Sequence, residues 1–292
     1  MSAEMLRTMS GFFASRDEFA DKARRENFPV ASRVLPRAAR ANLMAIYGFA
    51  RLTDDVGDEA EGDRLALLDG LEAELELAAE GKATYPTFQK LTPVIRELGL
   101  SLDPFRRLIE ANRMDQRVSS YRTFDDLVAY CMLSAAPVGE LVLSAFRLSS
   151  PERVRLSDKV CIALQLVEHL QDVHEDAVSG RVYLPLEDME RFGCVESDLL
   201  QPSANARVRQ LVAYEVERAR RLMNAGVSLA STLPLRPRVA VAGFVAGGVA
   251  ALNSIERAKF DVLGVRCRPR KLGVAGGMVR YVVAASSKQA RA

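Results

Sequence analysis

The chain has 292 residues, of which 49% are hydrophobic and 27% charged, so it can bury a large core and is not a disordered segment. Forty Lys and Arg against 38 Asp and Glu leave a formal charge of +2, which gives no indication of nucleic acid as the main partner. The four cysteines form no CxxC pair, which predicts reduced thiols in a cytoplasmic protein without a disulfide framework.

Helical periodicity recurs along the whole chain, so the sequence predicts an all-α protein. The N-terminus lacks the pattern of a secretory signal, and we expect the protein to stay in the cytoplasm. Short Gly, Pro and Ser clusters separate the helices, at residues 27–36, 81–86, 99–104, 149–151, 180–185, 201–203 and 233–237. With neither a long linker nor a repeat, residues 1–292 should form one helical domain with short flexible ends, and a boundary near Ser150 is the alternative.

An acidic segment closes a helix predicted from about residue 37 to residue 59. An apolar stripe leads into two carboxylates on this helix, with all its members within about 40° of one line: Leu43, Tyr47, Ala50, Asp54 and Asp58. Those carboxylates should face inward, whereas Asp55 and Glu59 lie off the line and are expected to be supporting or solvated acids. Arg51 is a candidate for holding diphosphate oxygens, and an ion pair with Asp54 is the equal alternative.

A helix broken at Pro137 follows, with small residues at 134–136 and 139. Small side chains leave room for a hydrocarbon tunnel, although close helix packing explains them as well.

A second acidic helix, residues 161–176, is apolar almost all round and carries a single polar stripe. The stripe is made of Cys161, Gln165, Glu168, His169, Asp172 and Asp176. Buried carboxylates are costly unless cations meet them, so this stripe should face an internal, wet cavity. Arg181 and Tyr183 come directly after the helix and are candidates for covering that site, with a plain loop around a buried Tyr as the alternative.

Two Asp pairs at i,i+4 spacing supply the hard oxygen ligands that suit Mg²⁺ together with phosphates. A single pair is more often a solvated helix face, but two pairs flanked by apolar residues favour metal binding. His169 and His174 point about 140° apart, so a zinc site has too few ligands.

The last third of the chain holds an apolar run, residues 239–252, that is too short for a membrane span and predicts a buried helix. The basic end that follows, residues 257–291, is either a solvated tail or a contact with anionic lipid at the inner membrane face.

These motifs resemble the squalene and phytoene synthase family. Arg51 to Glu59 is similar to the family's first aspartate motif, and Gln171 to Asp176 followed by Gly180 to Pro185 is similar to the second. Within the family the chain looks most like the bacterial hydroxysqualene synthases of the hopanoid pathway, through residues 26–32 and 134–139.

The resemblance implies a single helical isoprenoid synthase bundle around a central cavity, acting on presqualene diphosphate or another prenyl diphosphate. It implies Mg²⁺ or Mn²⁺ held by four acids and no NADPH. The metal ligands would be Asp54, Asp58, Asp172 and Asp176. Residues contacting diphosphate, its metal water shell or the substrate would be Arg51, Gln165, Arg181, Tyr47 and Tyr183, and Tyr130 would face the cationic intermediate.

Two positions depart from the family pattern. Asn27 stands where relatives that couple two prenyl diphosphates have a diphosphate-binding Ser, and Glu168 stands where an Asn metal ligand is usual. Both count as substrate-contacting candidates, and Glu168 puts the metal set in question because it adds a negative charge beside Asp172. The alternative functions are a presqualene diphosphate or phytoene synthase, or a non-catalytic helical protein that binds a partner or membrane. The sequence is compatible with either a monomer or a homodimer.

Overall fold

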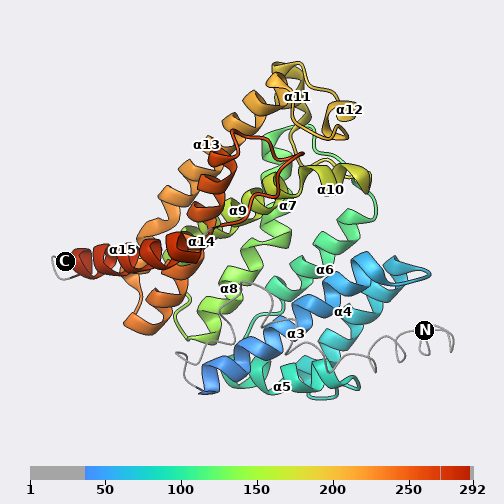
Figure 1. Ribbon diagram of the computed structural model, residues 1–292. Helices are drawn as coiled ribbons and strands as arrows, with labels where there is room; N and C mark the ends of the chain where they lie inside the picture. Colours follow the sequence, from blue (N-terminus) through green and yellow to red (C-terminus); the bar gives the residue numbers. More distant parts are fainter. Residues whose placement is uncertain (1–36, 270, 290–292) are drawn as a thin grey trace. The chain divides into compact units, whose positions relative to one another are not determined.

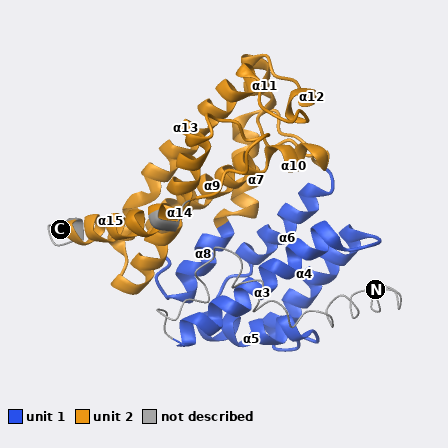
Figure 2. Ribbon diagram, viewed as in Figure 1, with its two compact units in different colours: residues 1–117, 137–149 blue, residues 118–136, 150–292 orange. Residues whose placement is uncertain are grey.

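The computed structural model describes residues 37–269 and 271–289 (Figure 1). Within those ranges the chain forms helices and no β-strand, and one isolated parallel bridge joins Ser120 and Val182. The predicted all-α class is therefore confirmed. The helices divide into two compact units, each described by itself: among the described residues, unit 1 holds 37–117 and 137–149, and unit 2 holds 118–136, 150–269 and 271–289 (Figure 2).

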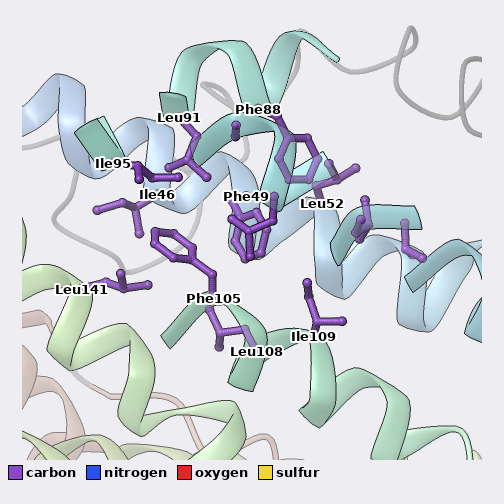
Figure 3. Packing of buried hydrophobic residues seen from close by; sticks show 14 of the residues in the cluster. Ile46, Phe49, Leu52, Phe88, Leu91, Ile95, Phe105, Leu108, Ile109 and Leu141 are labelled. Carbon is purple, nitrogen blue, oxygen red and sulfur yellow. The ribbon is translucent and has the colours of Figure 1, made fainter. Parts of the chain in front are cut away.

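Unit 1 is built from helices that each bury one apolar face. They are α3 (Arg37–Glu59), α4 (Arg64–Glu80), α5 (Pro86–Leu98), α6 (Asp103–Asp115) and α8 (Ala136–Ala145), the last from Pro137 on. Three Phe rings meet edge to face at the centre, with Phe49 5.7 Å from Phe88 and 5.1 Å from Phe105 between centroids (Figure 3). Such pairs add about 0.5–1.5 kcal/mol to the free energy of burial, which fixes α3 against α5 and α6.

Helix boundaries in unit 1 follow from capping residues. Asp63 caps α4 by accepting a hydrogen bond from the Ala66 backbone N–H at 3.0 Å. Gly81 ends α4 with φ +81°, a left-handed conformation that side chains rarely adopt. The connection at Gly81 lies at a predicted break, whereas the one before Asp63 was not among the predicted breaks.

Unit 2 holds the second acidic segment and the longest apolar helix. Its elements are α7 (Phe124–Ser134), α9 (Pro151–Gln171), α10 (Val173–Val178), α11 (Leu186–Phe192), α12 (Glu196–Leu199), α13 (Ala206–Gly226), the 3₁₀ helix η2 (Val227–Thr232), α14 (Leu235–Arg257) and α15 (Lys271–Gln289). Helix α9 packs along α13, and α14 packs along α15 (Figure 1). Close packing needs small residues: a Cβ on Gly226 would lie 2.6 Å from Val160 Cγ2.

The apolar run 239–252 lies in α14 and is largely buried in unit 2, as predicted. By length and composition alone, α14 and the helical stretch Phe124–Ala145 are apolar enough to cross a membrane, but 56% and 44% of their most apolar windows are buried inside the protein. A buried core helix passes the same test. The predicted break around Pro137 is confirmed, because α7 ends at Ser134 and α8 begins at Ala136.

Candidate active site: two acidic helix ends and an aromatic wall

The first acidic segment ends α3, as predicted. Asp54 and Asp58 keep exposed surface, whereas Asp55 is buried with 1% of its surface accessible. The Arg51 guanidinium pairs with Asp55, with 2.7 Å between Nη2 and Oδ1. Of the two alternatives for Asp55, the structure favours a supporting acid over a solvated one. An ion pair between Arg51 and Asp55 was not among the alternatives considered for Arg51. The pair forms because Asp55 lies one helical turn after Arg51, on the side where α3 is buried.

Asp54 has neighbours that alter its acidity. Asn112 of α6 donates a hydrogen bond from Nδ2 to Asp54 Oδ1 at 3.4 Å. Water reaches Asp54, but surrounding atoms desolvate its carboxyl group, and this desolvation, opposed by Asn112 and aided by the charge of Asp58, raises the pKa to about 7. A nearby cation would therefore stabilise the ionised form of this carboxyl group.

Gly57 allows Asn112 to approach α3. A Cβ at residue 57 would collide with the Asn112 side chain, and Gln116 donates a hydrogen bond to the Gly57 carbonyl at 3.0 Å. Glycine at this position therefore leaves room for the Asn112 amide, which hydrogen-bonds to Asp54.

The second acidic segment is not one continuous helix. Helix α9 ends at Gln171, Asp172 has φ −109° and ψ 14°, and α10 resumes at Val173. The Asp176 N–H still donates to the Asp172 carbonyl at 2.8 Å, so the two acids remain one turn apart. Glu168 and Asp172 of the polar stripe are exposed on an otherwise largely buried helix, and His169 of the same stripe is buried. That the stripe faces an internal cavity stays a prediction. Burial raises the pKa of Asp172 and the charge of Glu175 adds to this rise, while Arg266 opposes it.

A small pocket in unit 2 gathers several predicted residues. Its walls are His169, Val173, Asp176, Arg181, Val182, Tyr183, Leu184 and Leu199. The Arg181 N–H donates to the Asp176 carbonyl at 2.9 Å, which folds the chain after α10 back over the helix end. The structure therefore brings Asp176, Arg181 and Tyr183 together.

Four planar side chains form what we call the aromatic wall: Tyr121, Tyr130, His169 and Tyr183. The Tyr183 ring stacks on His169 at 3.8 Å and lies 5.7 Å from Tyr130, and Tyr121 lies 5.2 Å from Tyr130. Both Tyr121 and Tyr130 are buried. Aromatic faces attract cations, so this wall suits a positively charged intermediate.

A family model described as squalene/phytoene synthase matches residues 22–273. The chain belongs to the squalene/phytoene synthase family. Members of this family are synthases that process prenyl diphosphates, and the resemblance drawn from the two acidic motifs is confirmed.

Individual relatives carry different names. A hydroxysqualene synthase of Rhodopseudomonas palustris is 36% identical over 201 residues, which cover 67% of this chain and 68% of the relative. A phytoene synthase of Arthrospira platensis is 32% identical over 258 residues, which cover 82% of this chain and 83% of the relative. The crystal structure of squalene synthase HpnC from Alicyclobacillus acidocaldarius has 39% identity and a TM-score of 0.77, covering 89% of this chain and 97% of that one. The likeness confirms the isoprenoid synthase fold.

The remaining predicted site residues are placed as follows. Tyr47 is half-buried on α3, in unit 1 with Arg51, Asp54 and Asp58. Gln165 is half-buried on α9, and its side chain meets His169. Asn27 lies outside the described residues. The roles assigned to all these residues stay predictions.

Sequence reasoning missed three contributors. His169 was placed in the polar stripe and weighed as a zinc ligand but given no role of its own, Asn112 carries no motif, and Tyr121 lies in a loop before α7. Its i,i+4 spacing from Gln165 could have marked His169 as a hydrogen-bonding partner. No local pattern reveals Asn112 or Tyr121, because their contacts depend on tertiary packing.

The donor set of the family's two motifs fits magnesium. Within residues 37–269 and 271–289 no group of three or more His, Cys, Asp or Glu side chains is assembled as a metal cluster. Mg²⁺ usually binds through one or two carboxylates, keeps several waters and takes further oxygens from substrate phosphates. Asp54, Asp58 and Asp172 are exposed and Asp176 is half-buried, so the two acidic helix ends offer carboxylates of this kind without a preformed cage.

Proposed function

We propose that this member of the family is a hydroxysqualene synthase, which converts presqualene diphosphate and water to hydroxysqualene and diphosphate. The observation that carries the proposal is that the aromatic wall adjoins Asp176 and Arg181 around one pocket of unit 2. A cation-stabilising surface beside groups suited to a departing diphosphate is what ionisation of a prenyl diphosphate needs. The specific product is inferred from the hydroxysqualene synthase relatives, from residues 26–32 and 134–139, and from Asn27.

Asp54, Asp58, Asp172 and Asp176 are the residues that would hold Mg²⁺, with Mn²⁺ as a substitute. Bound metal would neutralise charge on the diphosphate as it leaves. Arg51 and Arg181 would add positive charge around its oxygens, and Gln165 would supply an amide. Both Asp pairs should be needed for turnover.

In the proposed reaction the carbon–oxygen bond breaks and its electron pair leaves with diphosphate. The cyclopropylcarbinyl cation then opens, a water oxygen forms the new bond, and the water releases a proton. Tyr130, Tyr121 and Tyr183 would shelter the cation until capture. Atoms and electrons balance without a reductant, so the reaction needs no NADPH.

Substrate choice tests the proposal. Purified protein with Mg²⁺ should convert presqualene diphosphate to hydroxysqualene and should leave farnesyl diphosphate alone unconverted. Accumulation of presqualene diphosphate from farnesyl diphosphate, or of phytoene from geranylgeranyl diphosphate, would replace the proposal with a head-to-head coupling enzyme. The similarity to a phytoene synthase makes that coupling reaction the second candidate.

Helix α15 supports a further proposal, that the protein works in the cytoplasm against the inner membrane face. Val279 and Val283 on this helix are 60% and 58% exposed, Arg280 is exposed beside them, and the helix sequence contains no acid. An exposed arginine beside exposed apolar side chains, on a helix without acids, suits an anionic lipid surface.

Flotation with vesicles containing anionic lipid should recover the protein at low salt, and Val279→Ser with Val283→Ser should weaken recovery severalfold. Val178→Ser, a substitution at an exposed valine on α10, is the matched control. Equal recovery with neutral vesicles, or no effect of the α15 changes, would contradict the membrane proposal.

A further inference from the structure

We propose that His169 is a positioning residue: it fixes the amide of Gln165 with the carbonyl oxygen turned away from the imidazole and available to the substrate assembly of cation and diphosphate, and it supports the ring of Tyr183. The inference rests on the proposed function only in assigning Gln165 to that assembly. No role of this kind follows from the two aspartate motifs, and it concerns contacts made entirely inside unit 2.

The hydrogen bond determines which way the amide points. Gln165 Nε2 lies 3.3 Å from His169 Nε2. An amide nitrogen only donates, so the imidazole Nε2 must be the acceptor and its proton must sit on Nδ1. The Gln165 carbonyl oxygen then points away from His169, and it accepts no hydrogen bond from the described residues. A free carbonyl oxygen is suited to a metal-bound water or another positive group.

The other contact of His169 is with the aromatic wall. Its ring stacks on Tyr183 with a centroid distance of 3.8 Å and an interplanar angle of 11°. Tyr183 in turn lines the pocket with Asp176 and Arg181. The His169 imidazole therefore contacts both the Gln165 amide on α9 and the Tyr183 ring in the loop after α10, and it sets the position of one relative to the other.

His169 is buried, with 8% of its surface accessible. Burial lowers its pKa to about 3, so it stays neutral over the whole working range of pH. A protonated Nε2 would face the amide N–H₂ and break the contact, because both groups would be donors. The arrangement therefore depends on neutral histidine with a defined tautomer.

Variants separate the two contacts. His169→Phe keeps a ring against Tyr183 and removes the acceptor, whereas His169→Gln places an oxygen near the position of Nε2. We expect His169→Phe to lower kcat for pyrophosphate release about 10- to 100-fold, the usual loss for a residue that orients a ligand, with little change in Tm. His169→Gln should recover most of that loss.

A double-mutant cycle asks whether His169 acts through Gln165. Gln165→Met together with His169→Phe should be no slower than Gln165→Met alone, because the second change removes nothing further. Losses that multiply, or a His169→Phe enzyme at parental rate, would make His169 an ordinary core residue and overturn the inference. The cycle is run with whichever prenyl diphosphate the parent enzyme converts.

Two readouts are independent of turnover. The chain has only two histidines, so ¹⁵N NMR of labelled protein can assign His169 by the signal lost in His169→Gln. We expect its Nε2 unprotonated and its Nδ1 protonated from about pH 5.5 to 8. Thermal stabilisation by Mg²⁺ with inorganic pyrophosphate should fall in His169→Phe and return in His169→Gln.

A proton on Nε2, or equal stabilisation of all variants, would contradict the positioning role. If instead these results hold while presqualene diphosphate is not converted, only the substrate assignment fails.

Discussion

Asp54 and Asp172 occupy the positions where the loss of one carboxylate should matter most. Asp54→Asn or Asp172→Asn should lower turnover at least about 100-fold, because each removes a charged oxygen meant for the cation on the diphosphate. The folded protein should lose little stability, since both side chains keep exposed surface.

Steady-state assays and thermal melts of the same samples measure both effects. Glu61→Gln is the control, because it removes an exposed acid just beyond the end of α3. Parental turnover in both Asp variants would favour a non-catalytic helical protein.

Individual side chains show the limit of helical periodicity. It identified Asp54, Asp58, Asp172 and Asp176 as members of polar lines, and Asp54, Asp58 and Asp172 do keep exposed surface. It left Asp55 open between a supporting and a solvated acid, because the spacing on one helix does not show where Arg51 will pair. Pairing and burial are set by other helices, which no local pattern contains.

At the scale of elements, Glu215 of α13 makes the packing against α11 depend on pH. Burial raises the pKa of Glu215 to about 8, Arg218 opposes the rise and Asp188 adds to it. Arg218 Nη1 donates to Asp188 Oδ2 at 2.7 Å and to Glu215 Oε1 at 2.9 Å. A raised acid pKa contributes stability that is complete below its ordinary value and is lost as pH rises through about 8.

We therefore expect the free energy of unfolding to fall by on the order of 2 kcal/mol between neutral and alkaline pH, and Glu215→Gln to flatten this decline. Urea denaturation at pH 6 and pH 9 measures it. Glu217→Gln, at an exposed acid of the same helix, should keep the parental slope. An unchanged slope in Glu215→Gln would show that Glu215 does not titrate in this range.

The packing of α9 against α13 gives a second prediction for elements. Gly226→Ala would place a Cβ 2.6 Å from Val160 Cγ2 and 2.8 Å from the Leu156 carbonyl oxygen. The Leu156 carbonyl belongs to the α9 backbone, which cannot move away as easily as a side chain. The expected cost is about 1–3 kcal/mol.

Gly247→Ala on α14 is the matched control, since its Cβ would meet nothing within 4 Å. This change should be neutral or stabilise by up to about 1 kcal/mol. Chemical denaturation compares the two, and equal effects would contradict the close packing of α9 and α13.

Element boundaries were predictable where Gly and Pro mark them, as at Gly81 and Pro137. The break of the second acidic helix at Asp172 was not, because neither Gly nor Pro marks it. A change of φ and ψ at one residue leaves the apolar periodicity almost unaltered, so the break is seen in the three-dimensional structure and not in the sequence pattern.

For the whole molecule, periodicity predicted the all-α class, and two short motifs predicted the family that the family model and the relatives establish. The expected single domain stays a prediction beside two compact units, whose boundaries include the alternative near Ser150. Composition and periodicity carry no information on how helices group into units, so the sequence could not decide between one domain and two.

The proposed function makes one distinctive claim about the reaction, that water supplies the product oxygen. Presqualene diphosphate incubated with the enzyme and Mg²⁺ in H₂¹⁸O should give hydroxysqualene with one ¹⁸O in its hydroxyl group, as read by mass spectrometry. A hydrocarbon product without oxygen, or a hydroxyl that carries no label, would contradict capture of the cation by water.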